Sequence, residues 1–197
     1  DFTIDTSKPT KPGAPDLQSG SDSGIMSNDN LTNDYSPTYD IASLTATDSI
    51  YLYFGSNIVS RNVLSGGTSI SLTASNQTNA TYTISARARD KAGNLSSASN
   101  TISVVIDTAR PSKPNAADLI TSYDSGFSNS DDTTNIDQPS FDLTGLSATR
   151  DSLRLLVDGA ISTAAVMSQA SRDTFQLGTA LTDGTYSLTL VAIDSAG

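Results

Sequence analysis

The sequence predicts an all-β protein made of two tandem β-sandwich domains, the second lacking its last strand. The first observation is an internal repeat: residues 4–47 align without a gap on residues 106–149, with 20 identities in 44 positions. The second is strict alternation of apolar and polar residues in short runs, which is typical of sheets with one buried face. The third is that all 21 acidic residues are Asp, which favours turns and is a poor helix former.

The domain boundaries follow from a repeated joint. Residues 106–114 read Ile-Asp-Thr-Ala-Arg-Pro-Ser-Lys-Pro and nearly reproduce residues 4–12. Two prolines three apart make a stiff, extended connector. We therefore expect residues 1–6 to end a preceding repeat or linker, residues 7–106 to form repeat 1, and residues 107–197 to form repeat 2. The alignment offset grows to 104 by Gly93 and Gly197, so repeat 2 has no counterpart of residues 94–106 and is expected to be truncated before its last strand.

Alternation places six or seven strands in about 100 residues, the density of a β-sandwich. Repeat 1 is expected to have strands near residues 15–17, 37–44, 50–54, 70–72, 82–88 and 102–106. Repeat 2 is expected to have strands near residues 141–143, 153–157, 175–177 and 186–192. Tyr82 and Tyr186 begin corresponding strands, where sandwich folds often use a tyrosine hydroxyl to fix a corner. For both tyrosines we favour the simpler role of packing in the core.

One polar loop is unusually long for a compact domain. Nineteen residues separate Leu17 from Pro37, and nineteen separate Leu119 from Pro139. Loops of this length are usually functional or disordered. Neither Lys nor Arg occurs in residues 12–60 or 114–149, so the loop carboxylates have no counter-charge nearby in sequence. This pattern indicates a bound cation, although the spacing of an EF-hand with its closing Glu is absent.

Three motifs are shared with a known family. They are the joint Ile-Asp-Thr-x-x-Pro-x-x-Pro, the Asp-Ser-Gly and Thr-Asn loop, and Ala-Arg-Asp-Lys-Ala-Gly-Asn at residues 88–94. Together they resemble the bacterial Ig-like repeats of giant surface adhesins of the biofilm-associated, type I-secreted kind. The resemblance implies an extracellular, cell-surface rod of monomeric Ig-like sandwiches, often stiffened by Ca²⁺. Its partners would be neighbouring repeats of the same chain, with a host-cell or matrix surface reached through other domains.

The topology of an Ig-like sandwich brings particular loops to each end of a domain. The expected Ca²⁺ ligands are Asp5, Asp48 and Asp90 at the entry end of repeat 1, Asp107, Asp151 and Asp194 at the entry end of repeat 2, and Asp22 and Asp29 in the loop of repeat 1 that would face repeat 2. Hard cations take six to eight oxygens from such a set. For any single Asp, turn formation is the simpler explanation. For the joint as a whole, the recurrence of three acids favours Ca²⁺.

Composition disfavours several function classes. The chain has no His and no Cys, which excludes Ser-His and Cys-His catalysis and disulfides. A net charge of -10 argues against nucleic acid, and no stretch has the length of a membrane span. We expect no enzyme but a non-catalytic spacer of a surface adhesin, serving cell adhesion and biofilm formation. Two alternatives remain: a glycan- or protein-binding module that uses exposed Tyr51 and Tyr53, and an accessory domain of a secreted hydrolase.

Overall fold

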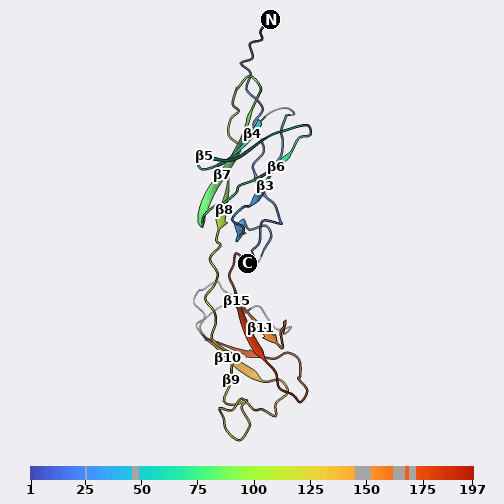
Figure 1. Cartoon of the computed structure of the whole chain (residues 1–197), viewed down its shortest axis with the longest axis vertical. Helices are drawn as coiled ribbons and strands as arrows, with labels where there is room; N and C mark the ends of the chain where they lie inside the picture. Colours follow the sequence, from blue (N-terminus) through green and yellow to red (C-terminus); the bar gives the residue numbers. More distant parts are fainter. Residues whose placement is uncertain (25, 46–48, 145–151, 162–166, 169–171) are drawn as a thin grey trace. The chain divides into compact units, whose positions relative to one another are not determined.

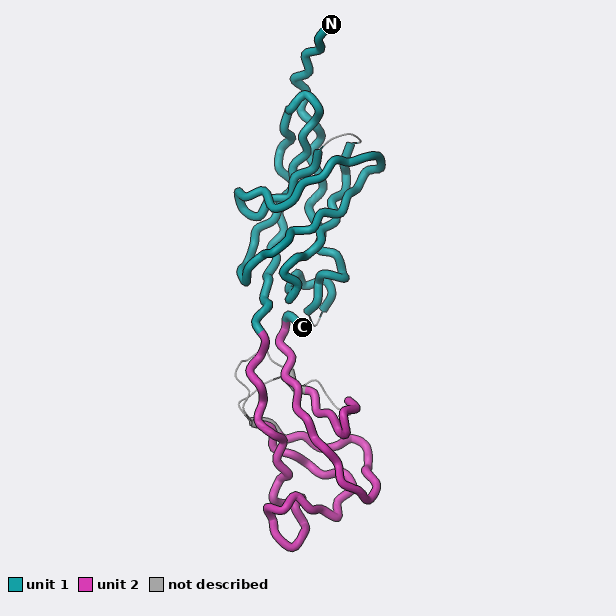
Figure 2. The backbone as a smooth tube through the Cα atoms, viewed as in Figure 1, with its two compact units in different colours: residues 1–109, 196–197 teal, residues 110–195 magenta. Residues whose placement is uncertain are grey.

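The computed structural model describes residues 1–197 except 25, 46–48, 145–151, 162–166 and 169–171. The described part contains fifteen strands and no helix, which confirms the all-β prediction (Figure 1). Consequently it contains no helix that is long and apolar enough to cross a membrane. The chain divides into two compact units (Figure 2). Unit 1 comprises Asp1–Ala109 with Ala196–Gly197, and unit 2 comprises Arg110–Ser195.

Unit 1 is a sandwich of a three-stranded and a five-stranded sheet. The smaller sheet has the order β1 (Asp16–Leu17), β3 (Thr38–Ile41), β6 (Ile70–Thr73). The larger has the order β2 (Leu31–Thr32), β8 (Ile102–Ile106), β7 (Ala80–Arg89), β4 (Ser49–Phe54), β5 (Asn57–Val63). All pairs are antiparallel except β2 and β8, which run parallel. This parallel pair attaches the long polar loop to the last strand of the domain.

The core of unit 1 is the apolar face that alternation predicts. Ile50, Leu52 and Phe54 of β4 are at most 5% exposed, and they alternate with Tyr51 and Tyr53 along the strand. The buried set is Leu17, Tyr39, Ile41, Leu44, Ile50, Leu52, Phe54, Leu64, Leu72, Ala74, Ile84, Ala86, Ala88, Val104 and Ile106. Burial of this apolar face is the main term that stabilises the sandwich.

Two strands of unit 1 were not predicted. β5 follows a turn in which Gly55 has a φ of 60°, and most of its residues are exposed, so no burial pattern reveals it. β2 has only two residues and exists because β8 pairs with it. Both misses have the same cause: the strand is defined by its partner and not by its own sequence.

Unit 2 also has two groups of paired strands. One has the order β14 (Arg172–Gln176), β10 (Ser140–Thr144), β9 (Asp118–Leu119). The other contains β12 (Ala160–Ile161), β11 (Ser152–Val157) and β13 (Met167–Ser168), with β15 (Leu188–Ile193) also paired to β11. Its buried core comprises Leu119, Phe141, Leu143, Leu155, Phe175 and Leu177. Among its described residues no strand corresponds to β8.

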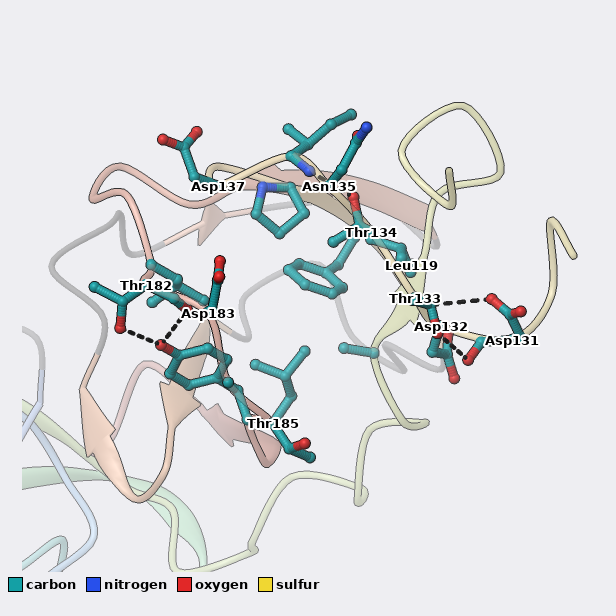
Figure 3. Close-up of a pocket in the computed structure, with 18 residues that line it drawn as sticks. Leu119, Asp131, Asp132, Thr133, Thr134, Asn135, Asp137, Thr182, Asp183 and Thr185 are labelled. Atoms are coloured by element: carbon teal, nitrogen blue, oxygen red, sulfur yellow. Dashed lines mark hydrogen bonds between the residues drawn. The ribbon is translucent and has the colours of Figure 1, made fainter. Parts of the chain in front are cut away.

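Both units have a tyrosine corner, so the expectation that Tyr82 and Tyr186 serve the core alone is wrong. The Tyr82 hydroxyl donates to the carbonyl of Thr78 at 2.9 Å. The Tyr186 hydroxyl donates to the carbonyl of Thr182 at 2.7 Å (Figure 3). Each hydrogen bond ties the strand to the turn four residues upstream, as in immunoglobulin sandwiches.

Candidate functional site

The long loop of unit 1 is ordered by hydrogen bonds of the protein itself. The amides of Val105 and Asp107 donate to the carbonyls of Asn30 and Thr32 at 2.9 and 2.8 Å. Thr32 is fully buried, and its hydroxyl donates to the carbonyl of Ser21. The loop is therefore held to β8 on one side and closed on itself on the other.

Asp22 and Asp29, two of the predicted ligands, lie together in this loop. Asp22 is 4% exposed, and its Oδ2 accepts from the Asn30 amide at 3.3 Å. Asp29 Oδ1 accepts from the Leu31 amide at 3.1 Å. Burial raises the pKa of Asp22 above its usual range, the Asn30 amide opposes the shift, and the neighbouring Asp29 carboxylate adds to it. The protein thus keeps two like charges close to each other.

The donor chemistry of this pair fits a hard cation. Asp22 Oδ1 is buried and has no hydrogen-bond partner among the described residues. A hollow beside Asp22 is lined by Ser27, Asn28 and Asn30, whose side chains and backbone supply further oxygens. Within the described ranges, however, no group of three His, Cys, Asp or Glu residues gathers in a way that could hold a metal. Asp22 and Asp29 therefore supply two carboxylates and no third.

Asp5 and Asp90, predicted to meet at the entry end of unit 1, are joined by an asparagine. The Asn94 side-chain amide donates to the Asp5 carbonyl and to Asp90 Oδ2, both at 2.9 Å. Desolvation works to raise the pKa of Asp90, but hydrogen bonds from the Asn94 side chain and from nearby amides outweigh it and lower the pKa. Sequence reasoning missed Asn94 as a functional residue, although its place four residues after Asp90 was the available signal.

The remaining predicted ligands are placed as follows. Asp107 follows β8, and its Oδ1 accepts from the Ala109 amide at 3.0 Å and the Asn79 side chain at 3.2 Å. Asp194 directly follows β15 in unit 2. Asp48 and Asp151 lie outside the described residues. Asp107 thus has a local structural role at the end of unit 1, in addition to any role as a ligand.

Unit 2 repeats the acid pair of the loop with Asp124 and Asp131, which sequence reasoning did not select. Asp124 is 6% exposed, and its two oxygens accept from the amides of Asp132 and Thr133, each at 3.3 Å. Asp131 Oδ1 accepts from the same Thr133 amide at 3.2 Å. The alignment of Asp22 with Asp124 and of Asp29 with Asp131 contained this signal. Unlike Asp22, Asp124 has a partner for both oxygens.

Of the two tyrosines in the alternative binding site, Tyr51 is buried and Tyr53 is partly exposed. Tyr51 is 9% exposed, and its hydroxyl interacts with Arg89 of β7 and Arg61 of β5. Hydrogen bonding to Arg89 lowers the pKa of its hydroxyl, desolvation opposes this effect, and Arg61 contributes to the lowering. The description of Tyr51 as an exposed residue is therefore wrong, and it packs against its cross-strand neighbours.

Unit 2 also has a hollow, which we call the unit 2 groove (Figure 3). Its volume is about 730 Å³, and its two walls are residues 131–137 and 181–186. Leu119, Phe141 and Leu188 give it an apolar lining, whereas Asp131, Asp132, Asp137 and Asp183 make its walls acidic. Among the residues that the structure describes, no lysine or arginine lines it.

Two stacked groups of strands with tyrosine corners, present twice in one chain, define tandem immunoglobulin-type sandwiches. The chain belongs to the bacterial Ig-like domain family, whose model matches residues 8–108 and 111–197. No match to a curated protein was found. The family assignment confirms the resemblance of the repeat motifs to those of bacterial Ig-like domains.

Several solved structures are similar to the chain. The fibronectin(III)-like modules of Clostridium thermocellum CbhA are 13% identical, with a TM-score of 0.49 over 98% of this chain and 86% of that one. The BSP domain of a biofilm-associated protein is 15% identical, with a TM-score of 0.31 over 94% of this chain and 28% of that one. A 1.5-MDa bacterial ice-binding adhesin is 14% identical, with a TM-score of 0.33 over 97% of this chain and 55% of that one. At these identities the likeness concerns the fold alone.

Proposed function

We propose that the chain is a non-catalytic spacer, formed by consecutive Ig-like repeats of an extracellular adhesin on a bacterial surface. The observation that carries the proposal is that nearly the whole chain consists of one family domain used twice. Among the described residues, those that recur between the repeats lie in joints, turns and the core and form no cluster of catalytic groups. A sandwich of this size would add roughly 40 Å to a stalk, given a rise near 3.3 Å per strand residue. In cell adhesion and biofilm formation, the repeats would then serve to lengthen the stalk of the adhesin.

We further propose that Ca²⁺ stiffens the joint between repeats. Asp107, Asp151 and Asp194 are the proposed ligands, with Asp22 and Asp29 as additional acids. Two observations support this: Asp5, Asp48 and Asp90 recur as these three acids, and a buried oxygen of Asp22 has no partner among the described residues. Extracellular Ca²⁺ modules bind at about 10⁻⁴–10⁻³ M, so such a joint would stiffen only after secretion.

Small-angle X-ray scattering of the whole chain in EDTA and in millimolar Ca²⁺ tests this proposal. We expect Ca²⁺ to increase the maximum dimension and to raise the melting temperature. At ten to a hundred times Kd the gain is roughly 1.4–2.7 kcal/mol. Asp107→Ala should abolish the difference between the two buffers.

Two controls separate a ligand from a structural residue. Asn79→Ala removes the local partner of Asp107 and should leave the Ca²⁺ response in place. Asp118→Ala makes the same charge change at an exposed position of β9 and should behave like the unchanged chain. Identical scattering of the unchanged chain in both buffers would reject Ca²⁺ at the joint and leave the spacer without a metal.

A further inference from the structure

The five-stranded sheet of unit 1 is positively charged, although the chain as a whole is strongly acidic. Its five strands contain three arginines and no acidic residue, whereas the chain has a net charge of -10. Arg61 lies in β5, and Arg87 and Arg89 lie in β7. Asp90, which follows Arg89, accepts hydrogen bonds from the amide and the side chain of Asn94. The strands of this sheet therefore supply no carboxylate that could neutralise the three arginines.

Strand pairing brings these arginines together on the outer face of the sheet. Tyr51 of β4 pairs with Arg61 on one side and with Arg87 on the other, so the two arginines flank the tyrosine. Arg89 lies on the same face as Arg87, because residues two apart in a strand point to the same side. Ala88 between them is buried in the core. The arginine face, as we call it, consists of Tyr51, Tyr53, Arg61, Arg87 and Arg89.

The arginine face is accessible and only partly occupied by contacts of its own. Arg61 and Arg89 are exposed, and Arg87 is half-buried. The Tyr51 hydroxyl interacts with Arg89 and Arg61, and Arg89 Nε donates to the Gly93 carbonyl at 3.3 Å. Each guanidinium has five N–H donors, so most of these donors stay available. Within the described part of the chain, no hydrogen bond or ion pair joins the three arginines to a carboxylate.

The fold itself does not require these arginines, because unit 2 has apolar residues at two of the same positions. At an offset of 104, Arg87 and Arg89 align with Val191 and Ile193 of β15. Val191 is 39% exposed and pairs in register with Arg154 of β11. The arginine face is thus a property of unit 1 and not of the repeat.

The opposite face of the same sandwich has two carboxylates side by side. Asp16 of β1 and Asp40 of β3 are paired in register, and both are exposed. We call them the aspartate pair. Gln18 Nε2 and the Ser71 hydroxyl donate to Asp40 Oδ1 at 2.7 and 2.6 Å, but no donor among the described residues reaches Asp40 Oδ2 or the Asp16 carboxylate. Like charges directly opposite each other destabilise a sheet, and a cation beside them relieves the repulsion.

We propose that the arginine face of one copy of the chain docks on the aspartate pair of a second copy. Guanidinium groups bind carboxylates through two parallel hydrogen bonds. Arg87 and Arg89 are roughly 7 Å apart along β7, given the rise of a strand. Asp16 and Asp40 are about 5 Å apart across their two strands. The long arginine side chains can span this difference, so each carboxylate can receive one guanidinium.

The two docking faces lie on opposite sides of one sandwich, which determines how copies associate. A pair of copies leaves one face of each kind free, so side-by-side association can continue beyond the dimer. The net charge of the copies opposes their approach. At physiological ionic strength, however, exposed charges farther apart than about 8 Å are largely screened, whereas groups in contact are screened less. This lateral pairing goes beyond the proposed role of the chain as a spacer.

Sedimentation equilibrium of the whole chain in EDTA tests the proposal at concentrations up to about 1 mM, where a complex with a Kd of that size is populated. We expect the average mass of the unchanged chain to rise with concentration past that of a dimer. Arg61→Gln with Arg87→Gln removes the arginine face, and Asp16→Asn with Asp40→Asn removes the aspartate pair. Each double variant alone should stay monomeric, because it has only one of the two faces. An equimolar mixture of the two should form a 1:1 complex and nothing larger.

A matched control makes the same charge change elsewhere. Arg110→Gln with Lys113→Gln, at two exposed positions outside the arginine face, should associate like the unchanged chain. Thermal unfolding checks that every variant is folded. An unchanged chain that stays monomeric, or folded variants whose mixture forms no complex, would overturn the proposal.

Two other outcomes would overturn the proposal in favour of a different partner or surface. Association that persists in either double variant would mean that another surface joins the copies. Binding of a soluble polyuronate by the arginine face of a chain that does not self-associate would identify an anionic carbohydrate as the partner instead.

Discussion

Units 1 and 2 share motifs, tyrosine corners and the acid pair of the long loop, yet they differ at one edge. In unit 1, β8 fills the space between β2 and β7 and buries Val104 and Ile106. In unit 2, residues 133–134 and 184–187, which align with β2 and with the start of β7, form no strand and lie beside the groove. In unit 1, β2 and the first part of β7 are thus strands that pair with β8.

The two units also differ in the hydrogen bonds of an equivalent aspartate in the long loop. Asp22 and Asp124 occupy equivalent positions and are almost equally buried. Both oxygens of Asp124 accept backbone amides, whereas Asp22 Oδ1 has no partner in the part of the chain described. Burial and the neighbouring Asp29 carboxylate therefore disfavour the charged form of Asp22, and only hydrogen bonds to its Oδ2 offset this effect.

The largest expected effect concerns β8 itself. Val104→Asp should destabilise unit 1 by about 3–5 kcal/mol, because it buries a charge without a partner. Val105→Asp, one residue along and 36% exposed, should cost less than about 1 kcal/mol. Urea unfolding followed by circular dichroism measures both, and unit 2 should be unaffected. Similar losses for the two variants would mean that β8 does not close the core as described.

A smaller effect should distinguish the two acid pairs. In EDTA at pH 7, Asp22→Asn should leave unit 1 unchanged or stabilise it by up to about 1 kcal/mol, because it removes repulsion with Asp29. Asp124→Asn should instead cost about 1 kcal/mol, because two amides lose a charged acceptor. Thermal unfolding of the two variants measures the contrast. A loss of equal size in both would show that the unpaired oxygen of Asp22 has no energetic consequence.

The pH dependence of Asp22→Asn gives an independent check of the same pair. In the folded state the pKa of Asp22 is raised above its ordinary value of 3.8. At a pH between 3.8 and this raised pKa, the folded state therefore binds more protons than the unfolded state. Stability from this group therefore increases as pH falls through the raised pKa toward 3.8. The unchanged chain should gain stability relative to Asp22→Asn over that interval, and parallel pH profiles would contradict the raised pKa.

Much of the fold could be predicted because burial leaves a period of two in the sequence. Ile50, Leu52 and Phe54 show it, and the structure confirms their strand. β2 could not be predicted, since a two-residue segment has no period and its paired residues in β8 lie 74 positions away in sequence. The candidate site could likewise be predicted only in part. The repeated acids pointed to Asp22 and Asp29. The bridging role of Asn94 could not be predicted, because it depends on a contact with the backbone of Asp5.

The central claim, that the two repeats share one fold and that pairing with β8 orders the start of β7 in unit 1, is tested most directly by amide hydrogen exchange resolved by residue. Tyr82 and Tyr186 are equivalent and both have a corner hydrogen bond, but only Tyr82 pairs with a last strand. We predict that the Tyr82 amide is protected and the Tyr186 amide exchanges at least about a hundredfold faster. Val191 of β15, whose backbone groups point toward β11 as those of Ser187 do, should remain protected, which would show that unit 2 is folded. Equal protection of Tyr82 and Tyr186 would contradict the account.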